Sequence, residues 1–166
     1  MDKKIIIING TGRSGKDTFV SCCSEYKKVL NVSTVDKVKE AAKILVGWDG
    51  TKDDKSRKLL VDLKRLSIDY NDYPTKYIAS RVEEFNNSDY ELMFIHIRES
   101  EEIDKAKKLF NAKTLLITNP NIELITSNDS DAKVNEYNYD YVILNDGSLD
   151  DLKSKAESFV GELWQH

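Results

Sequence analysis

The segment from Ile5 to Thr18 constrains the fold of this chain more than any other part of its sequence. Four consecutive isoleucines lead to Gly10, and Gly15-Lys16 follow after four further residues. This pattern predicts a buried strand, a glycine-rich turn whose N–H groups point at one concavity, and a helix. The helix start adds about half a positive charge there, and a lysine at this place reaches bound phosphates. We therefore predict an anion-binding loop, with a nucleoside triphosphate as its ligand.

The whole loop and the first helical turn are expected to form the cradle: Gly10, Thr11, Gly12, Arg13, Ser14, Gly15, Lys16, Asp17 and Thr18. Such loops commonly have Ser or Thr after the lysine, whereas this chain has Asp17 followed by Thr18. A carboxylate at this place binds magnesium through water, or orients Lys16 and the attacking group. The Thr18 hydroxyl is expected to meet the α phosphate. A glycine-rich turn without a ligand is the alternative interpretation.

The composition favours an ordinary globular protein. With 166 residues the chain is long enough for one well-buried domain, which we expect to span residues 1–166. No apolar run approaches the ~18 residues of a membrane span, and the first residues do not resemble a signal peptide, so a cytoplasmic location is expected. A net charge of -4 with interleaved Lys and Glu argues against nucleic-acid binding. The adjacent Cys22 and Cys23 are expected to be packing residues.

The alternation of apolar strands with amphipathic helices predicts an α/β fold. We expect a three-layer α/β/α sandwich with a five-stranded parallel sheet, its strands at 5–8, 32–35, 92–97, 114–118 and 141–144. Helices are expected after Lys16, at 36–46, 52–65, 74–85 and 101–110, and after a capping Ser148. The positions expected to face the core include Phe19, Val20, Cys23 and Tyr26 in the first helix and Val38, Ala41, Ala42, Leu45 and Val46 in the second.

Residues that follow the carboxyl ends of parallel strands meet in one crevice. By this rule the converging residues are Lys16, Asp17, Asp36, Lys39, His96, Arg98, Asn119 and Asn145. Asp36 is interpreted as a helix N-cap, as a site residue, or as both. Lys39 either faces the crevice or is a solvated helix lysine. The guanidinium of Arg98 suits a phosphoryl oxygen.

Phosphoryl transfer depends mainly on neutralising charge, so four cations are expected to form a clamp: Lys16, Lys39, Arg57 and Arg98. Arg13 joins them or points outward. A histidine packed in the sheet is the favoured interpretation of His96, over one that positions a water or a hydroxyl. Because position 96 lacks a carboxylate, magnesium is expected to be held by the nucleotide, waters and Asp17, or by Asp36.

Two further segments are expected to surround the ligands. Residues 52–86 form helices that we assign to binding of the phosphate acceptor, and Tyr70, Tyr73 and Tyr77 can wall its pocket, although packing is the default role of tyrosine. Residues 119–138 are polar and lack a clear period, which favours a functional loop or lid.

Several segments together resemble those of one enzyme family. They are Arg13-Ser14-Gly15-Lys16-Asp17-Thr18, residues 33–39, residues 56–60, Ile95-His96-Ile97-Arg98 with Glu102, Ser130-Asp131, and residues 145–148. The chain resembles the phosphate-loop kinases that include phage-type deoxynucleoside monophosphate kinases and animal-type phosphomevalonate kinases. The loop with Ser-Gly-Lys-Asp is the specific motif, and His96 replaces the aspartate that those enzymes have at the strand end.

This resemblance implies a P-loop nucleoside triphosphate hydrolase/kinase fold and transfer of the γ-phosphate of ATP, with magnesium, to a phosphorylated small molecule. The expected catalytic residues are Lys16, Asp17, Asp36 and Arg98; the acceptor is expected at Asp36, Lys39, Arg57 and Arg98, and Asn145 joins the loop in binding ATP. A (deoxy)nucleoside monophosphate is the first acceptor considered, and phosphomevalonate or dephospho-coenzyme A the second. An ATP-binding regulatory protein with little turnover is a further alternative. A monomer or a homodimer is expected.

Overall fold

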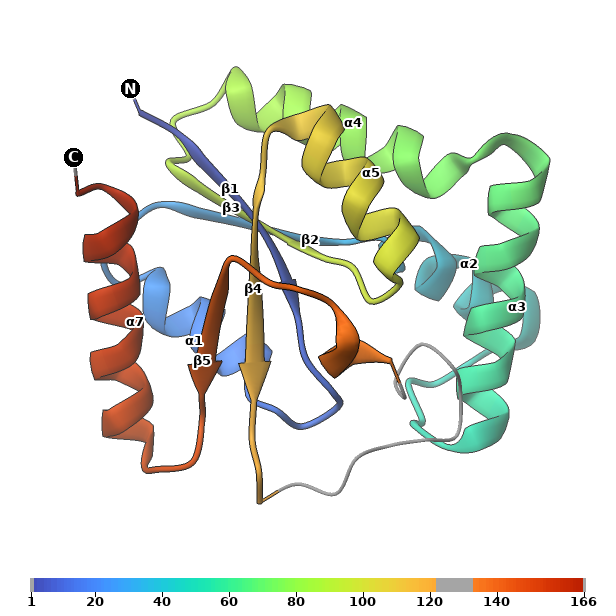
Figure 1. Ribbon diagram of the computed structural model, residues 1–166. Helices are drawn as coiled ribbons and strands as arrows, with labels where there is room; N and C mark the ends of the chain where they lie inside the picture. Colours follow the sequence, from blue (N-terminus) through green and yellow to red (C-terminus); the bar gives the residue numbers. More distant parts are fainter. Residues whose placement is uncertain (1, 122–132, 166) are drawn as a thin grey trace.

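The computed structural model of the protein describes residues 2–121 and 133–165. Five parallel strands form one sheet in the order β2-β3-β1-β4-β5. The strands are β1 (Lys4–Asn9), β2 (Val29–Ser33), β3 (Leu92–His96), β4 (Lys113–Thr118) and β5 (Tyr141–Leu144). Helices cover both faces of this sheet, so the predicted three-layer α/β/α sandwich is confirmed (Figure 1).

The helices divide between the two faces of the sheet. They are α1 (Lys16–Cys23), α2 (Asp36–Val46), α3 (Asp54–Asn71), α4 (Tyr73–Asn86), α5 (Ser100–Phe110) and α7 (Leu149–Leu163), with a 3₁₀ turn η1 (Val134–Glu136). Helices α1 and α7 pack on one face, and α4 and α5 pack on the other. Helices α2 and α3 lie to one side of the sheet, beyond the end of β2 (Figure 1).

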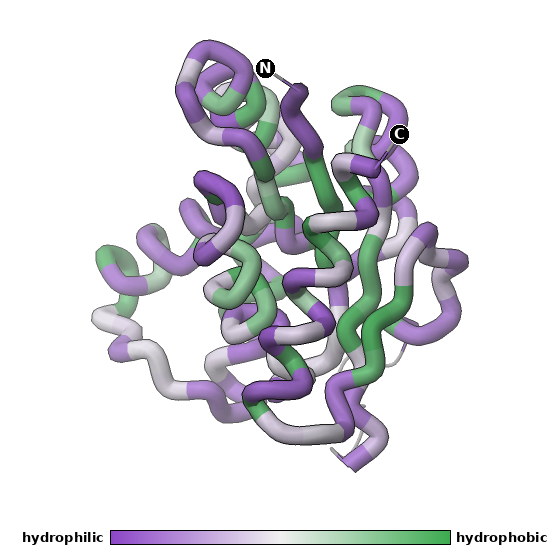
Figure 2. The backbone as a smooth tube through the Cα atoms, turned by 90° about the vertical axis from the view of Figure 1, so that its left-hand side faces the viewer, coloured by the Kyte–Doolittle hydropathy of each residue, from purple (hydrophilic) through white to green (hydrophobic). Residues whose placement is uncertain are grey.

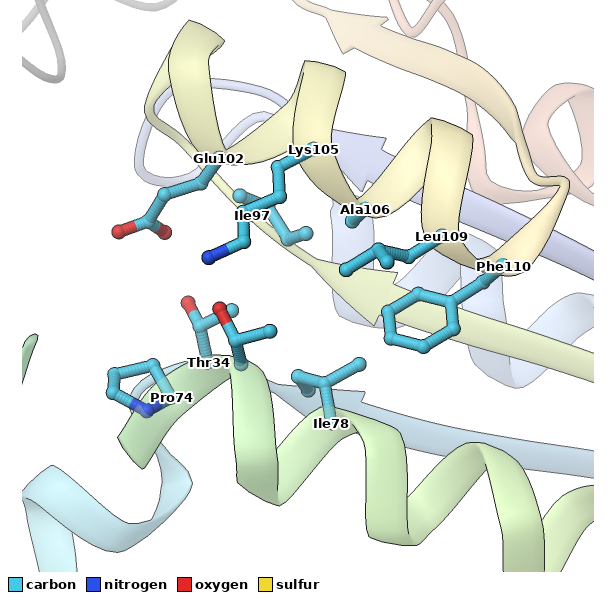
Figure 3. A pocket seen from close by; sticks show the side chains of 10 residues that line it. Thr34, Pro74, Ile78, Ile97, Glu102, Lys105, Ala106, Leu109 and Phe110 are labelled. Atoms are coloured by element: carbon cyan, nitrogen blue, oxygen red, sulfur yellow. The ribbon is translucent and has the colours of Figure 1, made fainter. Parts of the chain in front are cut away.

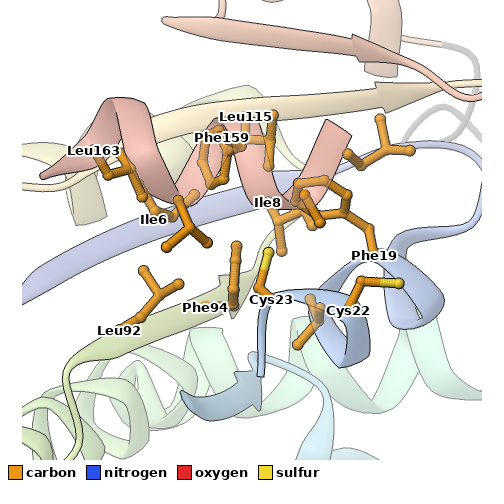
Figure 4. Packing of buried hydrophobic residues seen from close by; sticks show 14 of the residues in the cluster. Ile6, Ile8, Phe19, Cys22, Cys23, Leu92, Phe94, Leu115, Phe159 and Leu163 are labelled. Carbon is orange, nitrogen blue, oxygen red and sulfur yellow. The ribbon is translucent and has the colours of Figure 1, made fainter. Parts of the chain in front are cut away.

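The central strands are buried on both faces, as their continuous apolar sequences indicate. In β1, Ile6 and Ile8 point to the face covered by α1 and α7, and Ile7 points to the opposite face. Figure 4 shows the first of these clusters, in which the rings of Phe19 and Phe159 meet edge to face with centroids 5.5 Å apart. Along the chain, hydrophobic stretches mark the sheet, while hydrophilic and hydrophobic residues alternate in the helices (Figure 2).

Cys22 and Cys23 are both buried in this cluster with free thiols, which confirms their role in packing. Burial raises the pKa of the Cys23 thiol to about 12. Within residues 2–121 and 133–165, no helix is both long enough and apolar enough to cross a membrane.

The second strand lies earlier than predicted, at Val29–Ser33. It pairs with β3 over its full length, from Val29 beside Leu92 to Ser33 beside His96. Val35 then takes the N-cap position of α2, so the interpretation of Asp36 as the N-cap was wrong. Asp36 is instead the first helical residue.

Other expectations fail, most of them where helices extend past the sheet or end early. Ala41, expected in the core, is exposed. Tyr26 is exposed because α1 ends at Cys23. Leu45 and Val46 are exposed because the last turn of α2 lies beyond the sheet, and no other layer of the described structure covers them. Helix α3 runs to Asn71, which is longer than predicted. Apolar periodicity therefore predicted these helices but not their ends or every buried position.

Candidate functional site

The loop between β1 and α1 takes its shape from two glycines with positive φ, Gly10 at 157° and Gly15 at 99°. A Cβ atom on Gly10 would lie 2.4 Å from the backbone oxygen of Ile117, and one on Gly15 would lie 2.3 Å from Nδ2 of Asn145. Neither position has room for a side chain. The backbone can therefore approach its neighbours closely and turn its N–H groups into the concavity.

Asn9 supports the start of this loop from the end of β1. Its Oδ1 accepts a hydrogen bond from the Gly10 N–H at 2.8 Å. Its Nδ2 donates to the carbonyl oxygen of Arg98 at 3.1 Å and to the hydroxyl of Tyr139 at 2.9 Å. Asn9 is not among the residues predicted from the sequence, although a polar residue directly between four isoleucines and a glycine is a usable signal.

Asn145 supports the other end of the loop from beyond β5. Its Nδ2 donates to the carbonyl oxygen of Ser14 at 2.9 Å, and its own N–H donates to the Thr118 oxygen at 2.7 Å. Asn145 therefore contacts the loop, as the strand-end rule predicts. The Ser14 hydroxyl is buried and has no hydrogen-bond partner among the described residues. A buried hydroxyl without a partner is uncommon in a native protein.

Lys16 folds back over the loop that precedes it. Its Nζ donates to the oxygen of Gly10 at 2.7 Å and lies 3.4 Å from that of Thr11. Asp17 and Thr18 follow in the first turn of α1, both exposed. The N–H groups of a first helical turn have no partner within the helix, so ammonium and amides together make a site for an anion.

His96 lies half-buried at the end of β3, with Nε2 2.7 Å from Oδ1 of Asn31. Burial lowers the pKa of His96 to about 4. The charges of Asp17, Lys16, Asp36 and Lys39 also act on it, the two carboxylates raising this pKa and the two ammonium groups lowering it. Four predicted site residues thus lie within electrostatic range of this strand end. Because an amide oxygen only accepts, Nε2 carries the proton of the neutral ring.

The carboxylate of Asp36 is held in the first turn of α2. Its Oδ2 accepts a hydrogen bond from the Ser33 N–H at 2.9 Å and another from the Tyr77 hydroxyl at 3.0 Å. Burial, together with this hydrogen bond and the charge of Asp36, raises the pKa of Tyr77 to about 12. The contact joins α2 to α4 at the strand end.

A cavity of about 250 Å³ lies between α2, α3 and α4, next to this contact. Its wall is mainly apolar and includes Val38, Ala41, Leu63, Ser67, Tyr73 and Tyr77. Two of the three tyrosines proposed for such a wall are therefore present, whereas Tyr70 is 88% exposed and lies outside it. A cavity of about 20 Å³ between α4 and α5 has room for about one water (Figure 3).

The remaining predicted site residues are placed less centrally. Arg98 is exposed, but its backbone is tied to Asn9. Arg13 is exposed with φ of 65°, and Arg57 forms an ion pair at 3.0 Å with Asp54 of its own first turn. Asn119 forms a turn in which its side chain accepts the Asn121 N–H at 2.9 Å.

Most of the predicted lid, residues 122–132 with Ser130 and Asp131, lies outside the described residues. Its last residues, 133–138, contain η1 and pack on the body of the protein. There the Tyr137 hydroxyl donates to Asp104 at 2.6 Å, and Val134 is buried. Within residues 2–121 and 133–165, no three His, Cys, Asp or Glu side chains gather as a metal site.

No protein-family model matches the chain, and no curated protein matches it. Its fold is similar to that of several solved structures over nearly its whole length. The structure of TT1252 from Thermus thermophilus is 20% identical with a TM-score of 0.56, and 99% of this chain aligns with 100% of that one. The thymidylate kinase of Ehrlichia chaffeensis is 13% identical with a TM-score of 0.52, covering 96% of this chain and 100% of that one.

The shikimate kinase of Aquifex aeolicus is 12% identical with a TM-score of 0.50, covering 98% of this chain and 99% of that one. At such identities the likeness shows the fold alone. The chain has the fold of P-loop kinases, in agreement with the strand order and the glycine loop.

Proposed function

We propose that this protein is an ATP-dependent small-molecule kinase that transfers the γ-phosphate of ATP to a (deoxy)nucleoside monophosphate. The loop between β1 and α1 carries the proposal. The loop has no room for a side chain at Gly10 or at Gly15, and the side chain of Lys16 lies over the loop. The start of α1 supplies N–H groups and the positive end of the helix dipole.

The residues of this loop fit a triphosphate bound with magnesium. The Ser14 hydroxyl in the loop is buried without a hydrogen-bond partner among the described residues, and Asp17 offers an exposed carboxylate at the start of α1. In the proposed complex, Asp17 would help to hold magnesium, because carboxylates and waters are the ligands that this ion prefers. Magnesium–ATP supplies the phosphoryl group and part of its charge neutralisation.

The protein's own residues bind and orient the reactants. Lys16 and the loop amides hold the β and γ phosphates, and Asn9 and Asn145 fix the loop. Arg98, tied to Asn9 through its carbonyl, neutralises charge on the acceptor or the transferred group. Asp36, held by Tyr77, and Lys39 contact the acceptor at the end of β2. We assign Arg57 to the same acceptor region on sequence grounds.

The cavity between α2, α3 and α4 supports a nucleoside acceptor over a polar chain such as phosphomevalonate. Its wall is mainly apolar, and Tyr73 and Tyr77 offer aromatic surface to a flat base. We infer that residues 52–86 bind the acceptor, within one domain, and that neither nucleic acid nor a membrane is a partner.

The second candidate function is an ATP-binding regulatory protein with little turnover. His96 favours it, because a neutral ring stands at the strand end where a carboxylate would order the metal. The two functions share the loop and differ in whether phosphate is transferred.

The first test measures ADP release with ATP, magnesium and each nucleoside monophosphate in turn, with phosphomevalonate and dephospho-coenzyme A as further acceptors. We expect stimulation by at least one nucleoside monophosphate. Lys16→Ala should abolish it, whereas Lys43→Ala, in the last turn of α2, should not.

The same preparations are melted with and without magnesium–ATP. At a hundred times its Kd, ATP should stabilise the wild type by about 2.7 kcal/mol, and Lys16→Ala should lose most of this gain. Stabilisation without ADP release for any acceptor would favour the regulatory function. Stabilisation that is absent, or equal in Lys16→Ala, would contradict both.

A further inference from the structure

Helix α3 is attached to the rest of the protein in an unusual way. Of its 18 residues only Lys64 is buried, while Leu66 is 63% and Tyr70 is 88% exposed. Deep burial of apolar side chains therefore does little to fix this helix. A residue with positive φ lies on each side of the helix: Gly50 in the segment that precedes it and Asp72 directly after it.

Charge fixes α3 where apolar burial does not. The ammonium of Lys64 lies 2.9 Å from Oε2 of Glu99 and 2.8 Å from Oε2 of Glu102. The Lys64 side chain is 7% exposed, and the two carboxylates are 35% and 24% exposed. A lysine is rarely buried unless its charge is paired. Here the ammonium of Lys64 pairs with two carboxylates, those of Glu99 and Glu102, which lie in one segment.

The segment that receives Lys64 also carries Arg98. Glu99 follows Arg98 in sequence, and the Arg98 carbonyl accepts the hydrogen bond from Asn9. Asn9 in turn holds the N–H of Gly10. The segment is thus held on one side by α3. On the other side it is held by Asn9, which also holds the first residue of the anion-binding loop.

Stability alone does not account for this arrangement. A buried ion pair gains little over apolar residues of similar volume, because desolvation offsets the attraction between the charges. What it does supply is a fixed geometry, since the ammonium must meet both carboxylates at hydrogen-bond distance.

We propose that Lys64 is a positioning residue: by holding Glu99 and Glu102, it sets where Arg98 stands relative to the anion-binding loop. Its effect on turnover rests on the proposed kinase function, whereas its effect on the Arg98 segment does not. Lys64 itself does not touch the reactants in this proposal.

The test compares three changes at the cluster with one control. Lys64→Met removes the charge and keeps the length of the side chain, and Lys64→Arg keeps the charge. Lys64→Met combined with Glu99→Gln and Glu102→Gln removes all three charges, so that no buried carboxylate is left unpaired if the single change prevents folding. Lys105→Met is the control, because Lys105 pairs with Asp72 at the end of α3 and so also ties α3 to α5.

The first readout is hydrogen exchange of the backbone amides from Ile97 to Ser100. Lys64→Met and the charge-free variant should each speed their exchange by about tenfold or more, as expected when a local contact that restrains a segment is lost. Lys64→Arg should restore protection, and Lys105→Met should leave it unchanged. Unchanged exchange in a folded Lys64→Met or charge-free variant would overturn the proposal.

The second readout is the kinetics with the acceptor that the ADP-release test identifies. We expect kcat to fall roughly ten- to a hundredfold in Lys64→Met, as misplacement of a reacting group does, with the Kd of ATP within about twofold and kcat recovered in Lys64→Arg. An equal loss in Lys105→Met would show only that α3 must be attached, and would overturn the proposal. If the wild type transfers no phosphate, the kinase function fails while hydrogen exchange still decides the role of Lys64.

Discussion

Gly15 is constrained in the anion-binding loop both by its backbone conformation and by a close neighbour. Its φ of 99° is one that residues with a Cβ rarely adopt, and the Cβ would also meet the Asn145 amide at 2.3 Å. The same amide nitrogen holds the oxygen of Ser14. A side chain at position 15 would therefore displace the contact that supports the loop as well as strain the backbone.

Gly15→Ala should lower the unfolding free energy by more than about 1 kcal/mol and weaken ATP binding. Gly161→Ala is the matched control, since Gly161 lies within α7 and its Cβ would meet nothing within 4 Å. That substitution should stabilise the protein by about 0.5–1 kcal/mol. Chemical denaturation and calorimetric titration measure both effects. A Gly15→Ala protein with wild-type stability would show that the loop relaxes freely.

His96 gives the protein a pH dependence with a defined sign. The folded state lowers its pKa from the ordinary 6.5 to about 4, so between these values the unfolded chain binds a proton that the folded protein does not. The contribution of His96 to stability is fully present above about pH 6.5 and is lost as the pH falls to about 4. Chemical denaturation of the wild type and of His96→Gln is measured at a series of pH values. The difference between their unfolding midpoints should isolate this loss. A difference that stays constant over this range would contradict it.

The contact between Tyr77 and Asp36 joins two helices that the chain separates by α3. Two residues separate helix α2 from β2, and residues of both α2 and α4 line the same cavity. The hydroxyl of Tyr77 meets a carboxylate that already accepts the Ser33 N–H. This contact therefore holds the mouth of the proposed acceptor pocket in one arrangement.

Tyr77→Phe should cost about 1.5 kcal/mol of unfolding free energy, because it removes a hydrogen bond to a charged group. It should also raise KM for the acceptor more than KM for ATP. Tyr70→Phe is the control, since Tyr70 is 88% exposed, and its effect should stay within about 0.5 kcal/mol. Equal effects of the two substitutions would remove the Tyr77–Asp36 contact from any structural role.

The sequence predicts the architecture well, because each strand and helix has its own local signal. Buried strands appear as unbroken apolar runs, and Ser148 caps α7 with a reciprocal bond to Asp151, as its position suggested. Element ends are predicted less well, since they depend on pairing. β2 begins at Val29 because β3 offers a partner there, and that partner is about sixty residues away in the sequence.

Site residues that follow the ends of strands in the sequence were predicted. Site residues whose role depends on packing contacts were missed. The strand-end rule identified Lys16, Asp17, Asp36 and Lys39, whose charges all act on the His96 ring. It did not identify Asn9, whose partners lie at residues 98 and 139, or the cluster around Lys64. These side chains are recognised by what they contact, and a single sequence does not contain that information.

The place of β1 in the sheet has a consequence for how the chain folds. The first strand in the sequence is the middle strand of the sheet, and its two neighbours are β3 and β4. A growing chain therefore holds its apolar isoleucines without either partner until β3 has been synthesised, and without the second partner until β4 follows. Contacts so distant in sequence slow folding, since long loops must close before the pairing is rewarded. The four isoleucines are thus the segment that most needs shielding from aggregation while the protein is being made.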